Sequence, residues 1–143
     1  MILIDTNLLL YSQISSMPQH ARTAAWLQRQ LNSGMKVGLP WHSLLGFVRL
    51  ASNTRIFGRA QSTPESWRKV REWLSIDKVW IPQPTERHAD LLGEMLGKEH
   101  FSADSVMDAH LAALAIEHGL VLCSNDSGFA RFAKLRWLNP LEA

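Results

Sequence analysis

Short apolar runs alternate with stretches of helical periodicity along the whole chain, and this alternation constrains the fold more than any other feature. Apolar runs of strand length occupy residues 2–4, 37–39, 79–81 and 120–123. Helical patterns are expected at about residues 20–32, 41–53, 63–74, 84–97 and 104–118. This order predicts an α/β fold in which a mainly parallel central sheet has right-handed crossovers and helices on both faces.

Two of these helices carry clear signals. Residues 104–118 contain MDAHLAALAIEH, which is apolar on most faces and is typical of a helix buried on several sides. Gly119 follows it, at the place where a residue of left-handed conformation ends a helix. In residues 63–74 we expect Thr63 to cap the helix and Pro64 to occupy its first turn. The inward side of that helix is expected to carry Trp67, Val70 and Leu74.

Length and composition describe one globular domain over residues 1–143, because 46% of the residues are apolar and 20% are charged. A chain of this size buries roughly two thirds of its surface, so its core needs no disulfide or zinc. Cys123 is the only cysteine, which excludes a disulfide framework and a CxxC zinc site. No window approaches the roughly 18 apolar residues of a membrane span, and residues 1–11 do not read as a signal peptide. We therefore expect a protein of the reducing cytoplasm that does not contact a membrane.

The small net charge of +2 hides an uneven distribution of charged residues. Residues 20–71 contain nine lysines and arginines and a single acid, whereas residues 72–143 contain six basic and eleven acidic residues. This division favours a surface that faces a polyanion in the first half and an acidic feature in the second. Solvated helix faces that happen to be rich in arginine are the alternative explanation.

Three aspartates are expected to meet at one edge of the sheet. Asp5 directly follows the run 2–4 and Asp126 lies just past the run 120–123, where parallel sheets form ligand sites. Asp108 shares a helix stripe with apolar residues, so this helix would turn one carboxylate into the protein. Each of these acids alone also fits a structural role, as a loop or capping residue or as a buried acid satisfied by an arginine.

Three converging carboxylates would form a site of oxygen ligands suited to Mg²⁺ or Mn²⁺. Such an ion can lower the pKa of a bound water and stabilise the charge of a phosphodiester transition state. The basic first half could then position a nucleic-acid backbone over the acids. Asp104 precedes Asp108 by one helical turn and should face a similar direction, although a first-turn acid favoured by the helix dipole explains it slightly better than a ligand role does.

Several segments resemble PIN-domain ribonucleases, and most of all the VapC toxins of prokaryotic toxin–antitoxin pairs: the opening ILIDTN, the helix DAHLAALAIEHG, the following LVLCSNDSGFARF and the closing RWLNPL. The resemblance spans essentially the whole chain. It implies a PIN-like three-layer α/β/α sandwich and Mg²⁺- or Mn²⁺-dependent endonuclease cleavage of RNA, with tRNA or rRNA as candidate substrates. It also implies a homodimer that is neutralised by a cognate VapB-type antitoxin.

The resemblance assigns roles to particular residues. Asp5, Asp108 and Asp126 match three acids of the family's metal site, where they would be catalytic. Asn7 and Ser124 match polar positions beside that site which help to hold ligands or waters.

One position departs from the family pattern. Many members carry a glutamate early in the second helix, and in LLGFVRLAS this register holds Gly46. The nearest glutamate is Glu65, which is far along the chain. We hypothesise that Asp104 partly replaces the missing ligand. The alternative is a site that holds one ion, with waters completing its shell.

The basic residues expected to contact RNA are Arg49, Arg68 and Arg71. Two of them lie in residues 63–74 beside tryptophans, so this helix is the best candidate for an RNA or partner surface. The six histidines form no HxxxH or HxH pair, and we expect surface or core roles for them.

Two competing functions belong to other classes. A catalytically weak, RNA-binding regulatory PIN module is favoured by Gly46, where relatives carry a ligand. A phosphatase with an aspartyl nucleophile fits Asp5 at a strand end, but such enzymes usually need a second acid where this chain has Asn7.

Overall fold

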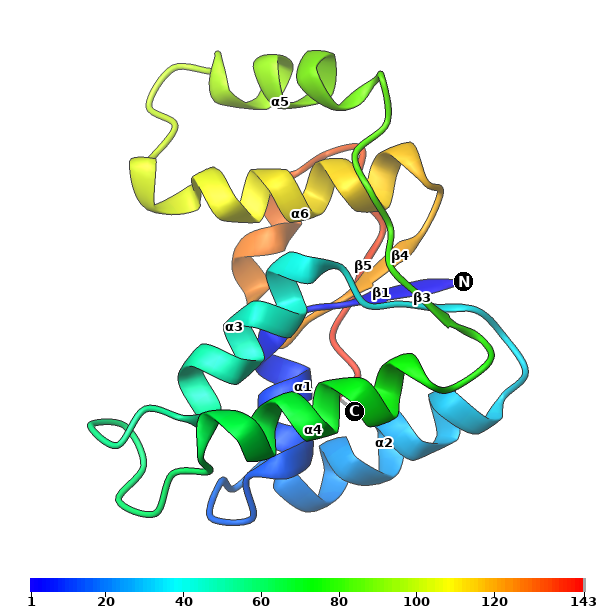
Figure 1. Cartoon of the computed structure of the whole chain (residues 1–143). Coiled ribbons are helices and arrows are strands. Elements are labelled where there is room, and N and C mark those ends of the chain that lie inside the picture. The colour runs from blue at the N-terminus through cyan, green and yellow to red at the C-terminus, as the bar shows by residue number, and fades with distance from the viewer. Residues whose placement is uncertain (143) are drawn as a thin grey trace.

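Five parallel strands form the centre of the molecule, in the order β3-β2-β1-β4-β5 (Figure 1). The computed structural model describes residues 1–142. The strands are β1 (Ile2–Ile4), β2 (Val37–Gly38), β3 (Val79–Trp80), β4 (Val121–Cys123) and β5 (Trp137–Leu138). The expected α/β fold is confirmed, and the sheet is parallel at each of its four strand pairings.

In residues 1–142, six α-helices and two short 3₁₀ helices connect the strands. The α-helices are α1 (Thr6–Gln13), α2 (His20–Asn32), α3 (Trp41–Ala51), α4 (Thr63–Leu74), α5 (His88–Leu96) and α6 (Val106–Glu117). The 3₁₀ helices are η1 (Ala103–Ser105) and η2 (Ser127–Arg131). No helix in residues 1–142 has the length and apolar character needed to cross a membrane.

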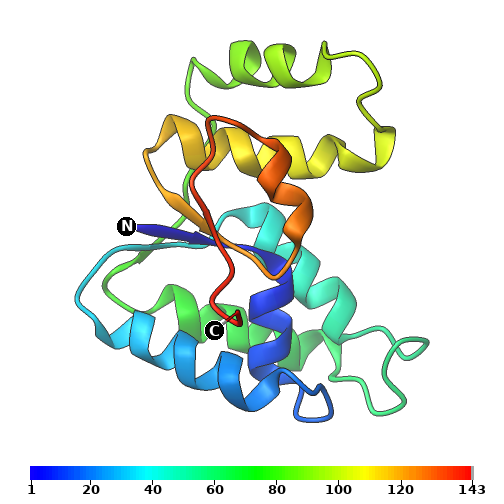
Figure 2. The ribbon, with the colours of Figure 1, turned by 180° about the vertical axis from the view of Figure 1, so that it is seen from behind.

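The helices form two layers on opposite faces of the sheet, as Figure 1 and the reverse view in Figure 2 show. Helices α1–α4 cover one face, and α6 with η2 covers the other, with α5 packed on the outer side of α6. Neighbouring residues of β1 serve the two sides, because Leu3 packs with the α6 layer and Ile4 with the α1–α4 layer. Both side chains are fully buried, which explains why the central strands are continuously apolar.

The order of the strands reverses at the centre of the sheet. From β1 the chain moves outward through β2 and β3, and it then returns to the other side of β1 to form β4 and β5. The order therefore reverses between β1 and β4. In open parallel sheets, ligands bind outside the carboxyl ends of the strands at such a reversal.

Two elements were not anticipated from the sequence. Helix α1 begins directly after β1, and the edge strand β5 pairs with β4 through two residues only. Helix α5 begins at His88, later than expected, because residues 86–87 form a turn.

The interpretation of residues 63–74 was wrong in two details. Ser62, not Thr63, caps α4, and its hydroxyl accepts a hydrogen bond from the N–H of Glu65. Trp67 does not face the core, because it is 39% exposed and stacks on Trp41 of α3 with 6.3 Å between ring centroids. Trp73 is the buried tryptophan of this helix.

Candidate metal centre

Asp5 lies at the carboxyl end of β1 and begins the site. Its side chain also caps α1, because one carboxylate oxygen accepts a hydrogen bond from the N–H of Thr6 at 2.7 Å. The other oxygen accepts from the Ser124 hydroxyl at 2.7 Å and from the Asn7 amide at 3.4 Å. Burial raises the pKa of Asp5 above its ordinary value, although the hydrogen bonds from Ser124 and Thr6 act in the opposite direction. The ionised carboxylate therefore carries a free-energy cost that a nearby cation would offset.

Residues that follow β4 support this carboxylate from the other side. The Ser124 hydroxyl donates to Asp5 and accepts a hydrogen bond from the N–H of Asp126 at 3.0 Å. The Asn7 amide donates to the Ser124 hydroxyl at 3.2 Å, and the Asn7 side-chain carbonyl accepts from the N–H of Asn125 at 3.2 Å. Asn7 and Ser124 thus lie beside Asp5 and orient its carboxylate.

Asp108 and Asp126 reach the same region from the second half of the chain. Asp126 caps η2 by accepting a hydrogen bond from the N–H of Gly128 at 2.8 Å. Asp108 lies in the first turn of α6, where its carboxylate accepts from the Arg131 guanidinium at 3.0 Å. Burial and the negative charge of Asp126 raise the pKa of Asp108, and Arg131 opposes that shift. The two carboxylates are therefore close enough to repel each other.

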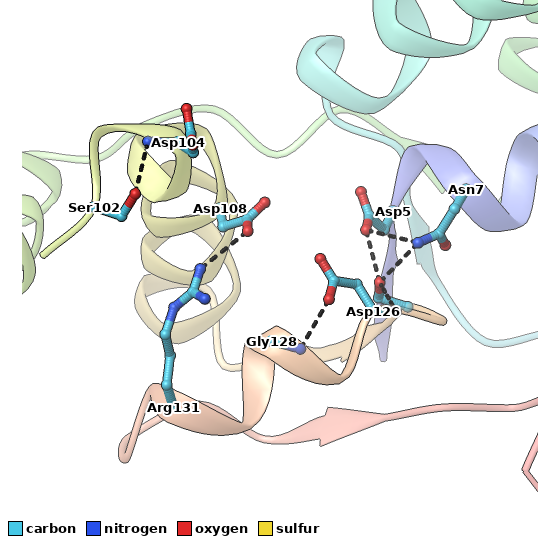
Figure 3. Close-up of polar contacts among 9 residues, drawn as sticks. Asp5, Asn7, Ser102, Asp104, Asp108, Asp126, Gly128 and Arg131 are labelled. Carbon is cyan, nitrogen blue, oxygen red and sulfur yellow. Dashed lines mark hydrogen bonds and ion pairs between the residues drawn. The ribbon is translucent and has the colours of Figure 1, made fainter.

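Figure 3 shows the carboxylates of Asp5, Asp108 and Asp126 turned toward one shared space, whereas that of Asp104 points away from it. Asp104 lies in η1, whose cap Ser102 accepts a hydrogen bond from the N–H of Asp104 at 3.2 Å. The expected position of Asp104 one α-helical turn before Asp108 is wrong, because α6 begins only after Asp104.

The three acids have the chemistry of a divalent-cation site, but they are not gathered tightly. Within the described part of the chain, no three histidine, cysteine, aspartate or glutamate side chains are arranged to hold a metal ion. Carboxylate oxygens are the ligands that Mg²⁺ and Mn²⁺ prefer, and a divalent cation would relieve the repulsion between Asp108 and Asp126. The donor set therefore fits such an ion, provided that the carboxylates draw together around it.

The packing of α1 against α3 accounts for the missing glutamate. A Cβ atom at Gly46 would lie 2.5 Å from Oγ1 of Thr6. That hydroxyl is held in place because it donates to the backbone carbonyl of Ser43 at 3.2 Å. A glutamate at this register would force the two helices apart, so glycine belongs to the close approach of α1 and α3.

His42 of α3 lies near the acids, and the sequence interpretation missed it. Its positive charge, when protonated, lowers the pKa of two of the three aspartates. The His42 ring stands edge-on to that of His110, with 6.0 Å between centroids. Nδ1 of His110 contacts Nε2 of His88 at 2.9 Å, and His88 is paired with Glu117. A series of side-chain contacts therefore links the α5–α6 junction to the site. The residues involved come from three separate elements, so their spacing in the sequence does not reveal these contacts.

The three candidate RNA-contacting arginines are exposed in the α1–α4 layer: Arg49 in the last turn of α3, and Arg68 and Arg71 on α4. An open groove of about 630 Å³ begins at Asp5 and is lined by residues of α1, by Leu50 of α3 and by residues of the loops that follow these two helices. The groove and these basic side chains thus belong to the same layer of the molecule.

Comparison with known proteins identifies the family. The PIN domain family matches residues 2–135. Ribonuclease VapC33 of Mycobacterium tuberculosis is 39% identical over 141 residues, which cover 99% of this chain and 99% of the relative. The structure resembles VapBC-1 from nontypeable Haemophilus influenzae with a TM-score of 0.70 and 20% identity, covering 99% of this chain and 100% of that one. It also resembles M. tuberculosis VapC20, a toxin that cleaves the sarcin–ricin loop, with a TM-score of 0.67 and 19% identity over 95% of this chain and 99% of that one. The order and spacing of the acids, the parallel sheet and these matches agree, and the chain belongs to the VapC family of PIN-domain proteins.

Proposed function

We propose that this chain is a Mg²⁺- or Mn²⁺-dependent endoribonuclease and the toxin of a VapBC-type pair. One observation carries the proposal: three carboxylates from distant parts of the chain face one space at the reversal of strand order, and two of them have raised pKa values. Buried and mutually repelling acids weaken a fold unless a cation lies among them, so their convergence indicates a functional site.

Asp5, Asp108 and Asp126 would hold the ion and are the proposed catalytic residues. The ion supplies a water of lowered pKa and neutralises charge that develops on the phosphodiester. Asn7 and Ser124 hold the carboxylate of Asp5 in one orientation through the hydrogen bonds described above. Ion binding thereby acts on a carboxylate that the protein has already positioned.

The proposed substrate is RNA, with tRNA and rRNA as the candidate classes. VapC33 is a ribonuclease and VapC20 cleaves the sarcin–ricin loop, which supports the choice of RNA. Arg49, Arg68 and Arg71 would bind the RNA backbone through its phosphates. A VapB-type antitoxin would inhibit the enzyme, and the VapBC-1 structure supports this partner. We expect the enzyme to act in the cytoplasm as a homodimer. Each chain would form a single domain over residues 1–143.

An RNA cleavage assay tests the proposal. Purified wild-type protein is incubated with total tRNA and rRNA in Mg²⁺, in Mn²⁺ or in EDTA, beside Asp5→Asn and Asp108→Asn. Asp77→Asn removes an exposed acid far from the site in sequence and serves as the matched control. We expect metal-dependent cutting by the wild type and the control, and loss of cutting in the two site variants. Equal cutting by all four proteins would reveal a contaminating nuclease, and no cutting by any of them would favour an RNA-binding module.

The same assay tests the role proposed for Asp104. If Asp104 partly replaces the missing glutamate ligand, Asp104→Asn should weaken metal binding and slow cleavage. Unchanged metal affinity and cleavage would leave the three aspartates and bound waters as the ligand shell.

A further inference from the structure

Arg131 is bound to one of the three site acids. Its guanidinium donates to Oδ2 of Asp108 at 3.0 Å, and its side chain is still 41% exposed. Figure 3 shows it reaching Asp108 from η2, on the side of that carboxylate away from Asp5. The pair thus joins a solvent-facing cation to a proposed metal ligand.

The local structure of η2 directs Arg131 toward this position. The guanidinium passes over Gly128, where an added Cβ atom would lie 3.2 Å from Nη1 of Arg131. It also lies 4.9 Å from the centre of the Phe132 ring, which is a cation–π contact. Gly128 leaves room for the guanidinium and the ring of Phe132 packs against it. The guanidinium can therefore lie close to the site.

The ion pair between Arg131 and Asp108 also affects the binding of a metal ion. The acids are not arranged around a cation in the described residues, and Asp108 is the one held by a competing positive charge. A divalent ion attracts this carboxylate more strongly than a singly charged guanidinium does. Ion binding would therefore displace Arg131, leaving five N–H donors exposed beside the metal. That planar group matches the geometry of a phosphate.

We propose that Arg131 positions the RNA phosphate, and that it is held by Asp108 until a divalent ion takes its place. The inference has two halves. The first, that a divalent ion displaces Arg131 from Asp108, does not depend on the proposed function. The second, that Arg131 then binds an RNA phosphate, rests on it. Arg131 thus has two successive partners, the carboxylate of Asp108 without metal and a phosphate of the RNA with metal.

The first half is tested by titrating Mn²⁺ into the protein without RNA and measuring free Mn²⁺ by electron paramagnetic resonance. Lys134→Ala is the matched control, because Lys134 lies three residues further on and pairs with Glu94 instead of a site acid. We expect Arg131→Ala to bind Mn²⁺ about twofold to fivefold more tightly than the wild type and Lys134→Ala, since an exposed ion pair no longer competes. Equal Mn²⁺ affinity in Arg131→Ala and Lys134→Ala would overturn this half.

The second half is tested by the binding of a fluorescent single-stranded RNA, followed by anisotropy with Ca²⁺ or with EDTA. Ca²⁺ takes the same oxygen ligands, and a gel checks that the RNA stays intact. We expect Arg131→Ala to lose about tenfold in RNA affinity with Ca²⁺ and less than twofold with EDTA. Arg131→Lys, which keeps the charge but not the planar fork, should recover only part of the loss.

Two results would overturn the exchange of partners. An equal effect of Arg131→Ala with Ca²⁺ and with EDTA would mean that Asp108 never withholds the guanidinium. No effect in either condition would exclude a contact between Arg131 and the phosphate. If even the wild type binds and cleaves no RNA, the proposed function fails together with the RNA half, and the Mn²⁺ titration still decides whether Arg131 competes for Asp108.

Discussion

The carboxylate of Asp5 has a structural role and a proposed chemical role. As the cap of α1 it satisfies a backbone N–H, and as a candidate ligand it faces Asp108 and Asp126. The capping bond orients the side chain before any ion arrives. A substitution at Asp5 therefore removes a helix cap together with a proposed metal ligand. A substitution at Asp108 removes a proposed ligand without removing a cap.

We expect Asp108→Asn to raise the melting temperature of the metal-free protein by about 1–3 °C at pH 7. The amide removes a charge that burial and Asp126 disfavour. Because the folded-state pKa of Asp108 is raised, the wild type loses stability as the pH rises through that pKa. The difference between the two proteins should therefore vanish near about pH 3, where Asp108 is protonated whether the chain is folded or not.

Circular dichroism melts in EDTA provide the measurement for Asp108→Asn. Asp77→Asn should leave the melting temperature unchanged. A lower melting temperature for Asp108→Asn at pH 7 would show that the ion pair with Arg131 outweighs the repulsion.

Gly46→Ala should lower the free energy of unfolding by about 1–2 kcal/mol. The added methyl overlaps Thr6, which typically costs about 1–3 kcal/mol, while the higher helix propensity of alanine returns up to about 1 kcal/mol. Urea denaturation measures the change. In a Thr6→Ala background, which removes the two nearest atoms, the same substitution should cost less. An equal cost in both backgrounds would exclude overlap with Thr6 as the cause.

How far the site could be predicted differs from residue to residue. Asp5 and Asp126 were predictable because each follows an apolar strand, and parallel strands bring their carboxyl ends to one edge of the sheet. Arg131 and His42 were not, because their approach to the acids depends on a 3₁₀ turn and on the tilt of α3. Asp104 was misplaced for a similar reason, since a 3₁₀ turn and an α-helix look alike over three residues.

At the scale of elements, the junction of α5 and α6 depends on one buried carboxylate. Glu117, the last residue of α6, accepts hydrogen bonds from His88 and from the N–H of Thr85. These contacts lower the pKa of Glu117, although burial opposes them. His110 continues the contact into α6, and burial together with the neighbouring His88 lowers its pKa. The polar contacts thus fasten α5 to a helix that carries a site acid.

Glu117→Gln should lower the free energy of unfolding by about 1–3 kcal/mol at pH 7, because a hydrogen-bonded charge is lost from a buried position. The lowered pKa means that the contribution of Glu117 is complete above about pH 4.5, its unfolded-state value, and disappears as the pH falls through the folded-state pKa. Urea denaturation at several pH values should show the wild type and the variant converging in acid. Glu86→Gln, an exposed neighbour of this junction, is the control. A pH-independent difference would mean that the side chain contributes by packing alone.

Helix α1 and strand β5 escaped prediction because neither carries a visible period. Leu8, Leu9 and Leu10 are consecutive and all buried, so the sequence of α1 shows no clear helical period. Asp5 was the available signal, since an aspartate before an apolar run is a helix cap. Strand β5 has only two residues, and its place is decided by pairing with β4.

At the scale of the whole molecule, the charge division of the sequence becomes a division between layers. The basic residues 20–71 supply α2, α3 and α4 on one face of the sheet, and the acidic second half supplies α5 and α6 on the other. The two layers meet at the edge where the acids lie. A polyanion should therefore approach from the side of α3 and α4.

We expect RNA affinity to fall steeply with salt concentration, and Arg68→Ala or Arg71→Ala to reduce the slope of log affinity against log salt by about 0.7–1 each. Each of these arginines would neutralise one phosphate. Arg87→Ala removes an exposed charge beside α5, in the acidic layer, and should leave the slope unchanged. RNA affinity measured from low to physiological salt concentration tests these slopes. Equal slopes for all variants would place the RNA on another surface.

Because β1 pairs with β4, the candidate metal centre can form only after β4 has been synthesised. Asp5 is synthesised more than a hundred residues before Ser124, which donates a hydrogen bond to it, and before Asp126. Contacts this distant in sequence form late in folding because they must close a long loop. A ribosome that stops before residue 121 leaves a chain with an exposed aspartate and no β4 to complete the centre. An incomplete copy would therefore lack the proposed metal site.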